Sequence, residues 1–263
     1  MTRTATIGVL VLLQGLGCSN QTSGGLFQGP FSIGGLERPS AGPLFFTTSL
    51  GWAVELDAAK IDLGPFYFNI DPPNTSQFRS GVVISESLQQ VTVDALNPVL
   101  LAVAGGIRGQ TGTAVAVEIG LFPPDSTITD PDVGGPAGNA TAYLTGLATM
   151  AGQQVPFKGW VVIDANLAST DTPLPWLQRV NGAVCDLDFA ASNQPLTLRV
   201  DPTSWFDGAD FSSLLPPGAA DGGTDAGPGG PYGWADVSNF EASVLNQIQA
   251  TTGVYAFELT NGQ

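Results

Sequence analysis

The sequence predicts an all-β protein: an antiparallel β-sandwich, jelly-roll or immunoglobulin-like, with one short C-terminal helix. Short apolar runs that alternate with period two recur from about Phe45 onward, and Gly, Pro, Asn and Asp separate them. The sequence has no long helical patterns between these runs, which argues against alternating βα units. With 263 residues, 43% of them apolar, the chain can bury one real core.

The strands are predicted from alternation and from β-branched or aromatic content between turn residues. They are expected at residues 52–56, 66–70, 91–93, 114–121, 157–163 and 196–200. In the run 114–121, alternation places Val115, Val117, Ile119 and Leu121 on one face. A hairpin is expected from Tyr143 to Val155, with Gly152 in its turn.

The one well-signalled helix is expected at residues 239–250. Ser238 and Glu241 have the spacing of a capping box, in which each side chain binds a backbone donor of the first turn. An apolar stripe follows at Phe240, Val244 and Ile248. The final run, residues 254–259, is expected to be a strand that this helix covers.

The N-terminus has the layout of a secretory signal peptide, predicted for residues 1–17. Arg3 precedes an apolar run from about Ala5 to Leu13, which is shorter than the ~20 residues that span a bilayer. Small residues and then Cys18 follow. An ordinary cleaved signal with an incidental cysteine is the simpler alternative.

The stretch Gly15-Leu16-Gly17-Cys18 resembles the lipobox of bacterial lipoproteins. Gly17 and Cys18 fit that pattern, whereas Gly15 stands where Leu is preferred and Leu16 where a small residue is usual. The resemblance implies that Cys18 is the acylated first residue of an exported protein and attaches it to the membrane. The polar and small residues that follow Cys18 predict a lipidated tether, residues 18–43, before a sandwich domain at 44–263. Ser19 is not the Asp that retains such proteins at the inner membrane, which favours the outer membrane.

The body of the chain is similar to uncharacterised secreted lipoproteins of Gram-negative bacteria. The stretches that carry this are Gly51-Trp52-Ala53-Val54-Glu55-Leu56, Leu63-Gly64-Pro65-Phe66-Tyr67-Phe68, Val200-Asp201 and Trp205-Phe206-Asp207-Gly208-Ala209-Asp210-Phe211. The resemblance implies an envelope location and a single domain, and it brings no activity with it.

Composition excludes several classes of function. The chain has no His, which removes Ser-His-Asp hydrolysis and His-ligated metal chemistry. Its net charge of −15 opposes binding to nucleic acid or to an anionic bilayer surface. Motifs such as Gly-x-Ser-x-Gly and Cys-x-x-Cys do not occur. We therefore expect no enzymatic activity and no cofactor.

Two kinds of binding residue remain as candidates. Trp176 and Trp234 lie in irregular stretches, where an exposed ring could stack on a sugar or a partner protein. The alternative, which we weight more heavily, is that such rings fold back onto the sandwich. Asp201, Asp207 and Asp210 could bind calcium, although their spacing is more typical of turn and capping residues.

Cys185 is expected to be a small buried residue. Asp186 and Asp188 flank it and would raise its pKa, which disfavours a reactive nucleophile. A disulfide with Cys18 is the other possibility, and lipidation of Cys18 would exclude it.

The preferred function is a lipid-anchored, non-enzymatic β-sandwich of the cell envelope with a binding or structural role, whose protein or glycan partner is unknown. A carbohydrate- or calcium-dependent recognition module is the second reading. A hydrolase that uses two carboxylates is the third, and it requires two facing acids about 5–10 Å apart.

Overall fold

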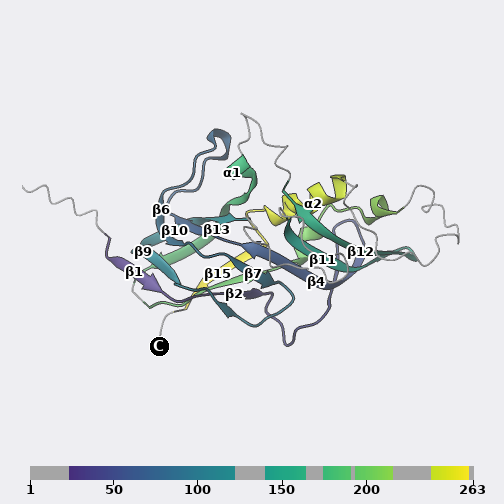
Figure 1. Ribbon diagram of the computed structural model, residues 1–263, viewed down its shortest axis with the longest axis horizontal. Coiled ribbons are helices and arrows are strands. Elements are labelled where there is room, and N and C mark those ends of the chain that lie inside the picture. The colour runs from purple at the N-terminus through teal and green to yellow at the C-terminus, as the bar shows by residue number, and fades with distance from the viewer. Residues whose placement is uncertain (1–23, 122–139, 164–173, 191–192, 216–237, 261–263) are drawn as a thin grey trace, which may run out of the picture.

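The computed structural model describes residues 24–121, 140–163, 174–190, 193–215 and 238–260. Within these ranges the strands form three sheets, which short helices accompany (Figure 1). None of the helices described combines the length and the hydropathy needed to cross a bilayer.

The largest of the three sheets has six strands. Every neighbouring pair in it is antiparallel. In spatial order the strands are β1 (Leu26–Gly29), β9 (Ile107–Gln110), β6 (Val83–Ser87), β5 (Phe66–Asn69), β10 (Gly112–Gly120) and β13 (Arg179–Phe189).

A four-stranded sheet packs against the inner face of the six-stranded sheet. Its order is β15 (Tyr255–Leu259), β14 (Leu196–Val200), β2 (Phe31–Gly35) and β8 (Leu101–Ala102). Phe31 of β2 lies edge-on to Phe66 with ring centroids 5.1 Å apart, and Phe68 contacts Phe257 of β15 at 6.0 Å. These contacts between the two sheets make the architecture a sandwich.

The remaining strands form a five-stranded sheet. Its order is β12 (Gln153–Val162), β11 (Ala140–Met150), β4 (Ala53–Leu63) and β3 (Leu44–Thr47), with β7 (Val91–Asp94) also paired to β4. Three short helices pack against it: η3 (Thr203–Phe206), η4 (Phe211–Leu214) and α2 (Ser238–Ile248). Phe211 joins them, because its ring lies 5.1 Å from both Phe157 of β12 and Phe240 of α2.

The structure confirms the all-β sandwich. The ends of each predicted strand agree within two residues, except in β4, β11 and β12, which are longer than predicted. The hairpin β11–β12 turns at Ala151 and Gly152, whose positive φ angles of 51° and 82° are those of a type I′ turn. One pair departs from the antiparallel expectation, because β14 runs parallel to β2.

The predicted tether at residues 18–43 is wrong from residue 26 onward. β1 and β2 lie in this segment, and Phe27, Phe31 and Ile33 are at most 2% exposed. The folded domain therefore begins before residue 44, because two sheets recruit these short strands through long-range pairing. The predicted signal peptide and Cys18 lie outside the described residues.

One local prediction also needs correction. Alternation predicts Val115 on the same face as Val117 and Ile119, but a register shift between Ala114 and Ala116 turns it outward, where it is 39% exposed while the other two are fully buried. In the predicted capping box, a carboxylate oxygen of Glu241 accepts a hydrogen bond from the backbone N–H of Val162 at 2.6 Å. This contact fastens α2 to β12.

Replacing Phe211 by Ala is expected to lower the free energy of unfolding by about 3–5 kcal/mol, because it leaves a cavity where β12, η3 and α2 meet. Phe45→Ala is the matched control: that ring is 68% exposed, so a change within about 0.5 kcal/mol is expected. Urea unfolding followed by tryptophan fluorescence measures both. Equal costs would contradict the aromatic junction described here.

Candidate functional site

A row of polar side chains crosses the outer face of the six-stranded sheet, with one residue from each strand. Their neighbours along the strands, such as Phe68, Val117 and Val180, are fully buried on the inner face. At ~4.8 Å between strands the row is about 24 Å long. The polar row, in register from β1 to β13, is Gln28, Arg108, Glu86, Tyr67, Glu118 and Asn181.

The first half of the polar row lies open in a groove of about 600 Å³. Arg108 and Glu86 form an ion pair there at 3.3 Å, with side chains 66% and 33% exposed. A Cβ on Gly109 would lie 2.1 Å from the carbonyl oxygen of Ile84, so only glycine fits between the two strands. The groove is lined by Leu26, Gln28, Ile84, Glu86, Arg108 and Gln110, among others.

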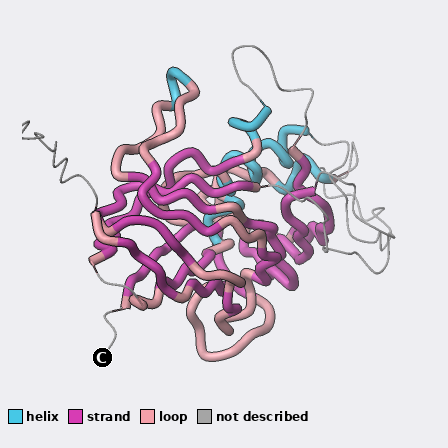
Figure 2. The backbone as a smooth tube through the Cα atoms, turned by 60° about the vertical axis from the view of Figure 1, so that its left-hand side comes forward, coloured by secondary structure: helices cyan, strands magenta, loops and turns pink. Residues whose placement is uncertain are grey.

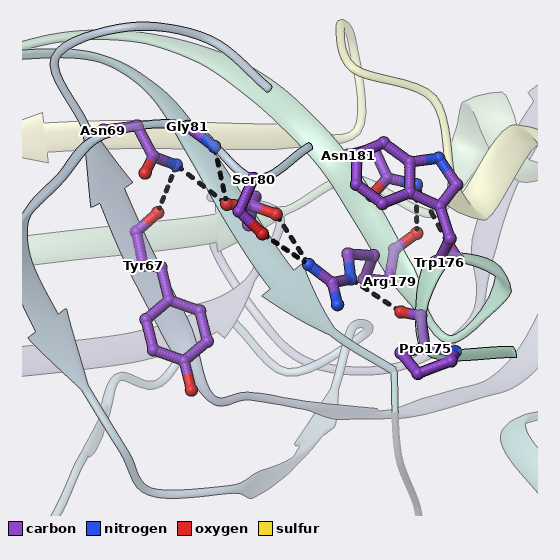
Figure 3. Close-up of polar contacts among 9 residues, drawn as sticks. Tyr67, Asn69, Ser80, Gly81, Pro175, Trp176, Arg179 and Asn181 are labelled. Atoms are coloured by element: carbon purple, nitrogen blue, oxygen red, sulfur yellow. Dashed lines mark hydrogen bonds and ion pairs between the residues drawn. The ribbon is translucent and has the colours of Figure 1, made fainter. Parts of the chain in front are cut away.

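The second half of the polar row is buried around the carboxylate of Glu118, which is 2% exposed (Figure 3). Arg179 donates to Glu118 Oε1 at 2.7 Å. The other oxygen, Oε2, accepts from the backbone N–H of Gly81 at 3.3 Å and from Asn69 Nδ2 at 3.4 Å. A buried carboxylate requires such a set of charged and polar partners.

Arg179 connects this buried pair to two segments that cover it. Its Nη1 also donates to Ser80 Oγ at 3.2 Å, and its Nε donates to the carbonyl of Pro175 at 2.6 Å. The ring of Trp176 lies beside the guanidinium, 5.3 Å from ring centroid to Cζ. Trp176 belongs to α1 (Leu174–Leu177), the helical turn that precedes β13.

The arm, residues 70–82, is the loop between β5 and β6. It stands out from the strands with η1 (Thr75–Gln77) at its tip, coloured as helix in Figure 2. Asn74 caps η1 by accepting from the backbone N–H of Gln77 at 3.1 Å. Phe78 ends it with a φ angle of 50°, and its ring lies edge-on to Trp176 at 5.6 Å. The arm and α1 thus meet over the buried half of the polar row.

Two amide oxygens in this half have no hydrogen-bond partner among the described residues. They are Oδ1 of Asn69, a fully buried residue, and Oδ1 of Asn181. Both Nδ2 groups are engaged: Asn69 donates to the Tyr67 carbonyl at 3.1 Å, and Asn181 donates to the Trp176 carbonyl at 3.0 Å. Unpaired buried acceptors cost about 1–3 kcal/mol each and are uncommon in folded proteins.

The structure describes one of the two tryptophans that the sequence offered as ligand-binding residues. Trp176 is 9% exposed and packs against Arg179 and Phe78, so its ring is not open to a ligand and the fold-back alternative describes it. Its role is to cover the polar row, which its irregular Pro-rich context did not reveal. Trp234 lies outside the described residues.

The three aspartates are turn and capping residues in the structure. Asp201 Oδ1 accepts from the backbone N–H of Thr203 at 2.9 Å, and Asp210 Oδ1 accepts from that of Ser212 at 3.0 Å. Asp207 Oδ1 accepts from the N–H of Ser49 at 3.3 Å. Nowhere in the described ranges do three acids or cysteines gather as a metal site would require. The calcium reading gains no support from these residues.

Cys185 is partly buried, and its thiol contacts the carbonyl of Ala114 at 3.4 Å. Burial, and secondarily the charge of Asp186, raises the pKa of the thiol to about 12. Because the thiolate is the reactive form, this environment disfavours nucleophilic chemistry, as the flanking aspartates predicted.

Comparison with known proteins adds little. No protein-family model and no curated protein matches the sequence. A solved structure, MbnP from Methylosinus trichosporium, aligns with 69% of this chain and 77% of its own at 12% identity, with a TM-score of 0.28. Similarity at this level carries no argument about fold or function.

Sequence reasoning did not single out Glu118, Arg179 or Asn69 as site residues. Glu118 was seen only as part of the strand run 114–121, yet a glutamate among Val, Ala and Ile in a central strand is the signal that marks it. Its partners lie 49 and 61 residues away, so no local pattern connects them.

The two ion pairs of the outer face give a matched test. Glu118→Gln is expected to lower the free energy of unfolding by about 3 kcal/mol, because it leaves Arg179 without its buried counter-charge. Glu86→Gln removes the exposed pair with Arg108 and should cost about 0–1 kcal/mol. Chemical denaturation at pH 7 measures both. A similar, small cost for the two variants would contradict the structural role of Glu118.

Proposed function

We propose that this chain is a lipid-anchored, non-enzymatic binding protein of the cell envelope that holds a saccharide chain in the groove of the six-stranded sheet. The observation that supports this most is the polar row, whose open half lines a groove of about 600 Å³. A face of planar, hydrogen-bonding side chains on rigid strands is suited to recognition of a polyhydroxylated ligand.

The chemistry of the groove fits such a ligand. The exposed amides of Gln28 and Gln110 each offer both donors and an acceptor, as vicinal hydroxyls require. Leu26, which is 86% exposed, and Ile84 supply apolar surface for the C–H faces of sugar rings. Hydrogen bonding and apolar contact together give orientation and affinity.

The charge of the polar row favours an uncharged ligand. The protein carries a net charge of −15, but on this face two glutamates are each paired with an arginine. The local charge is therefore balanced, so neither an anionic nor a cationic ligand gains a strong Coulombic advantage there. Because both carboxylates are engaged by arginines, the arrangement suits binding better than general acid–base catalysis.

An extended peptide is a weaker candidate for this surface. Peptides add to a sheet through free backbone groups at an edge strand. At the β1 edge, the carbonyl of Gln28 already accepts from the backbone N–H of Asn193 at 2.6 Å. The groove thus offers side chains and not an open edge.

The lipid anchor rests on the sequence around Cys18. Six residue steps separate Cys18 from Gly24, so the chain between them reaches at most about 22 Å. An acylated Cys18 would hold the groove, which begins at Leu26, close to the bilayer surface. Several acyl chains on one residue are sufficient for stable anchoring, whereas a single chain is marginal.

Binding can be tested by titration calorimetry of the mature protein with hexasaccharides of glucose, mannose and N-acetylglucosamine. We expect at least one to bind, and Gln28→Ala or Arg108→Ala to weaken it about 5- to 10-fold through the loss of hydrogen bonds worth ~1 kcal/mol. Gln154→Ala, an exposed glutamine on β12 away from the groove, should leave affinity unchanged. No heat with any of the three sugars would refute the proposed ligand class.

Acylation can be tested separately. Mass spectrometry of the protein from its native host should find an N-terminal Cys18 that bears acyl chains, and Cys18→Ser should move the protein from the membrane to the soluble fraction. The signal pattern before Cys18 is the reason. An unmodified terminus, at Cys18 or elsewhere, would rule out the anchor without affecting the groove.

A further inference from the structure

We infer that the saccharide site continues beneath the arm and α1, which together form a lid over a second, covered subsite made by Asn69, Glu118 and Asn181. This inference rests on the proposed function and extends it by assigning the ligand length and the regulation of the site. Asn69 is fully buried, and its Oδ1 has no hydrogen-bond donor among the described residues. This free acceptor indicates that the buried half of the polar row can bind a donor from a ligand.

The open groove and the covered subsite belong to one continuous row. Glu86, in the groove, is opposite Tyr67, and Tyr67 is opposite Glu118. Tyr67 is half-buried and marks the boundary, and Figure 3 shows its hydroxyl directed away from Asn69 and Ser80. A chain that enters along Arg108 and Glu86 would therefore meet Glu118 and Asn181 next, if the lid were raised.

The lid occupies the covered subsite with the contacts that a sugar hydroxyl would make. Gly81 donates its N–H to Glu118 Oε2, and Ser80 presents a hydroxyl that accepts from Arg179. A hydroxyl can donate to a carboxylate and accept from a guanidinium at the same time. The arm thus occupies positions on Glu118 and Arg179 that hydroxyls of a ligand would otherwise occupy.

The closed lid leaves the subsite incompletely satisfied. Oδ1 of Asn69 and Oδ1 of Asn181 lack donors in the described structure, and both are acceptors. Ligand hydroxyls are donors of the required kind. Donor-rich saccharides therefore fit the covered half better than the arm does.

The tip of the arm is also held by few contacts. Residues 74–80 of the arm are all exposed, and Phe78 against Trp176 is its one ring contact among the described residues. Segments with little buried apolar surface open at low free energy without global unfolding. Opening of the arm is therefore a local event, and the ligand would capture the open state.

Hydrogen exchange tests the lid itself. The double variant Phe78→Ala/Ser80→Ala removes the arm's ring contact and its hydroxyl without touching the buried carboxylate. We expect amide exchange to rise at least 5-fold at residues 79–82 and 176–179, with the rest of the six-stranded sheet unchanged. Gln77→Ala, in the same arm but with no contact to the row, is the control. Unchanged exchange at both segments in the double variant would overturn the lid.

Ligand length tests the covered subsite. The double variant should bind the hexasaccharide 3- to 10-fold more tightly, because a smaller fraction of its molecules has the lid closed. A disaccharide, which fills only the groove, should bind both proteins equally. In the double variant, whose lid is already loosened, adding Asn181→Ala should weaken binding of the hexasaccharide alone. If Gln28→Ala weakens binding as expected while the lid variant and the added Asn181→Ala leave hexasaccharide affinity unchanged, the covered subsite is wrong and the proposed function stands. If no sugar binds, both are wrong.

Discussion

A carboxylate buried in the middle of a sheet constrains everything around it, and Glu118 imposes this constraint here. With 2% exposure it cannot rely on water, so β13, β5 and the arm each supply a partner. A register shift between Val117 and Glu118 brings the glutamate opposite Asn181. The outer face of the six-stranded sheet is organised by this requirement, and α1 and the arm close over the result.

The inner face supplies the rigidity that the outer face needs. Phe68 of β5 contacts Phe31, Phe189 and Phe257, which belong to three other strands in two sheets. Because successive residues of a strand point to opposite faces, this packing also fixes Tyr67 and Asn69 on the outer face. Aromatic packing in the sandwich thus positions the polar row, and a polar row held this firmly loses little side-chain entropy on binding.

The sequence was informative wherever structure is local. Alternation located many of the strands, though not β3, β6, β8, β9 or β13, and the turn residues located the hairpin at Gly152, because both signals depend on neighbours in the chain. It failed for β1 and β2, whose short Gly- and Pro-containing runs are strands only because β9 and β14 pair with them. The same limit applied to the site. Glu118 was visible within a predicted strand, but Arg179 and Gly81 reach it only through the fold.

The distribution of cations links the composition to the site. After Cys18 the chain carries seven Lys and Arg side chains against 23 acids, and two of the seven, Arg108 and Arg179, pair with the two glutamates of the polar row. Acidic side chains elsewhere repel anions, while the polar row itself is charge-balanced. Neutral surface with many donors and acceptors recognises by hydrogen-bond geometry and not by charge. The proposed preference for an uncharged, hydroxyl-rich chain therefore rests on where a cation-poor protein has placed its few arginines.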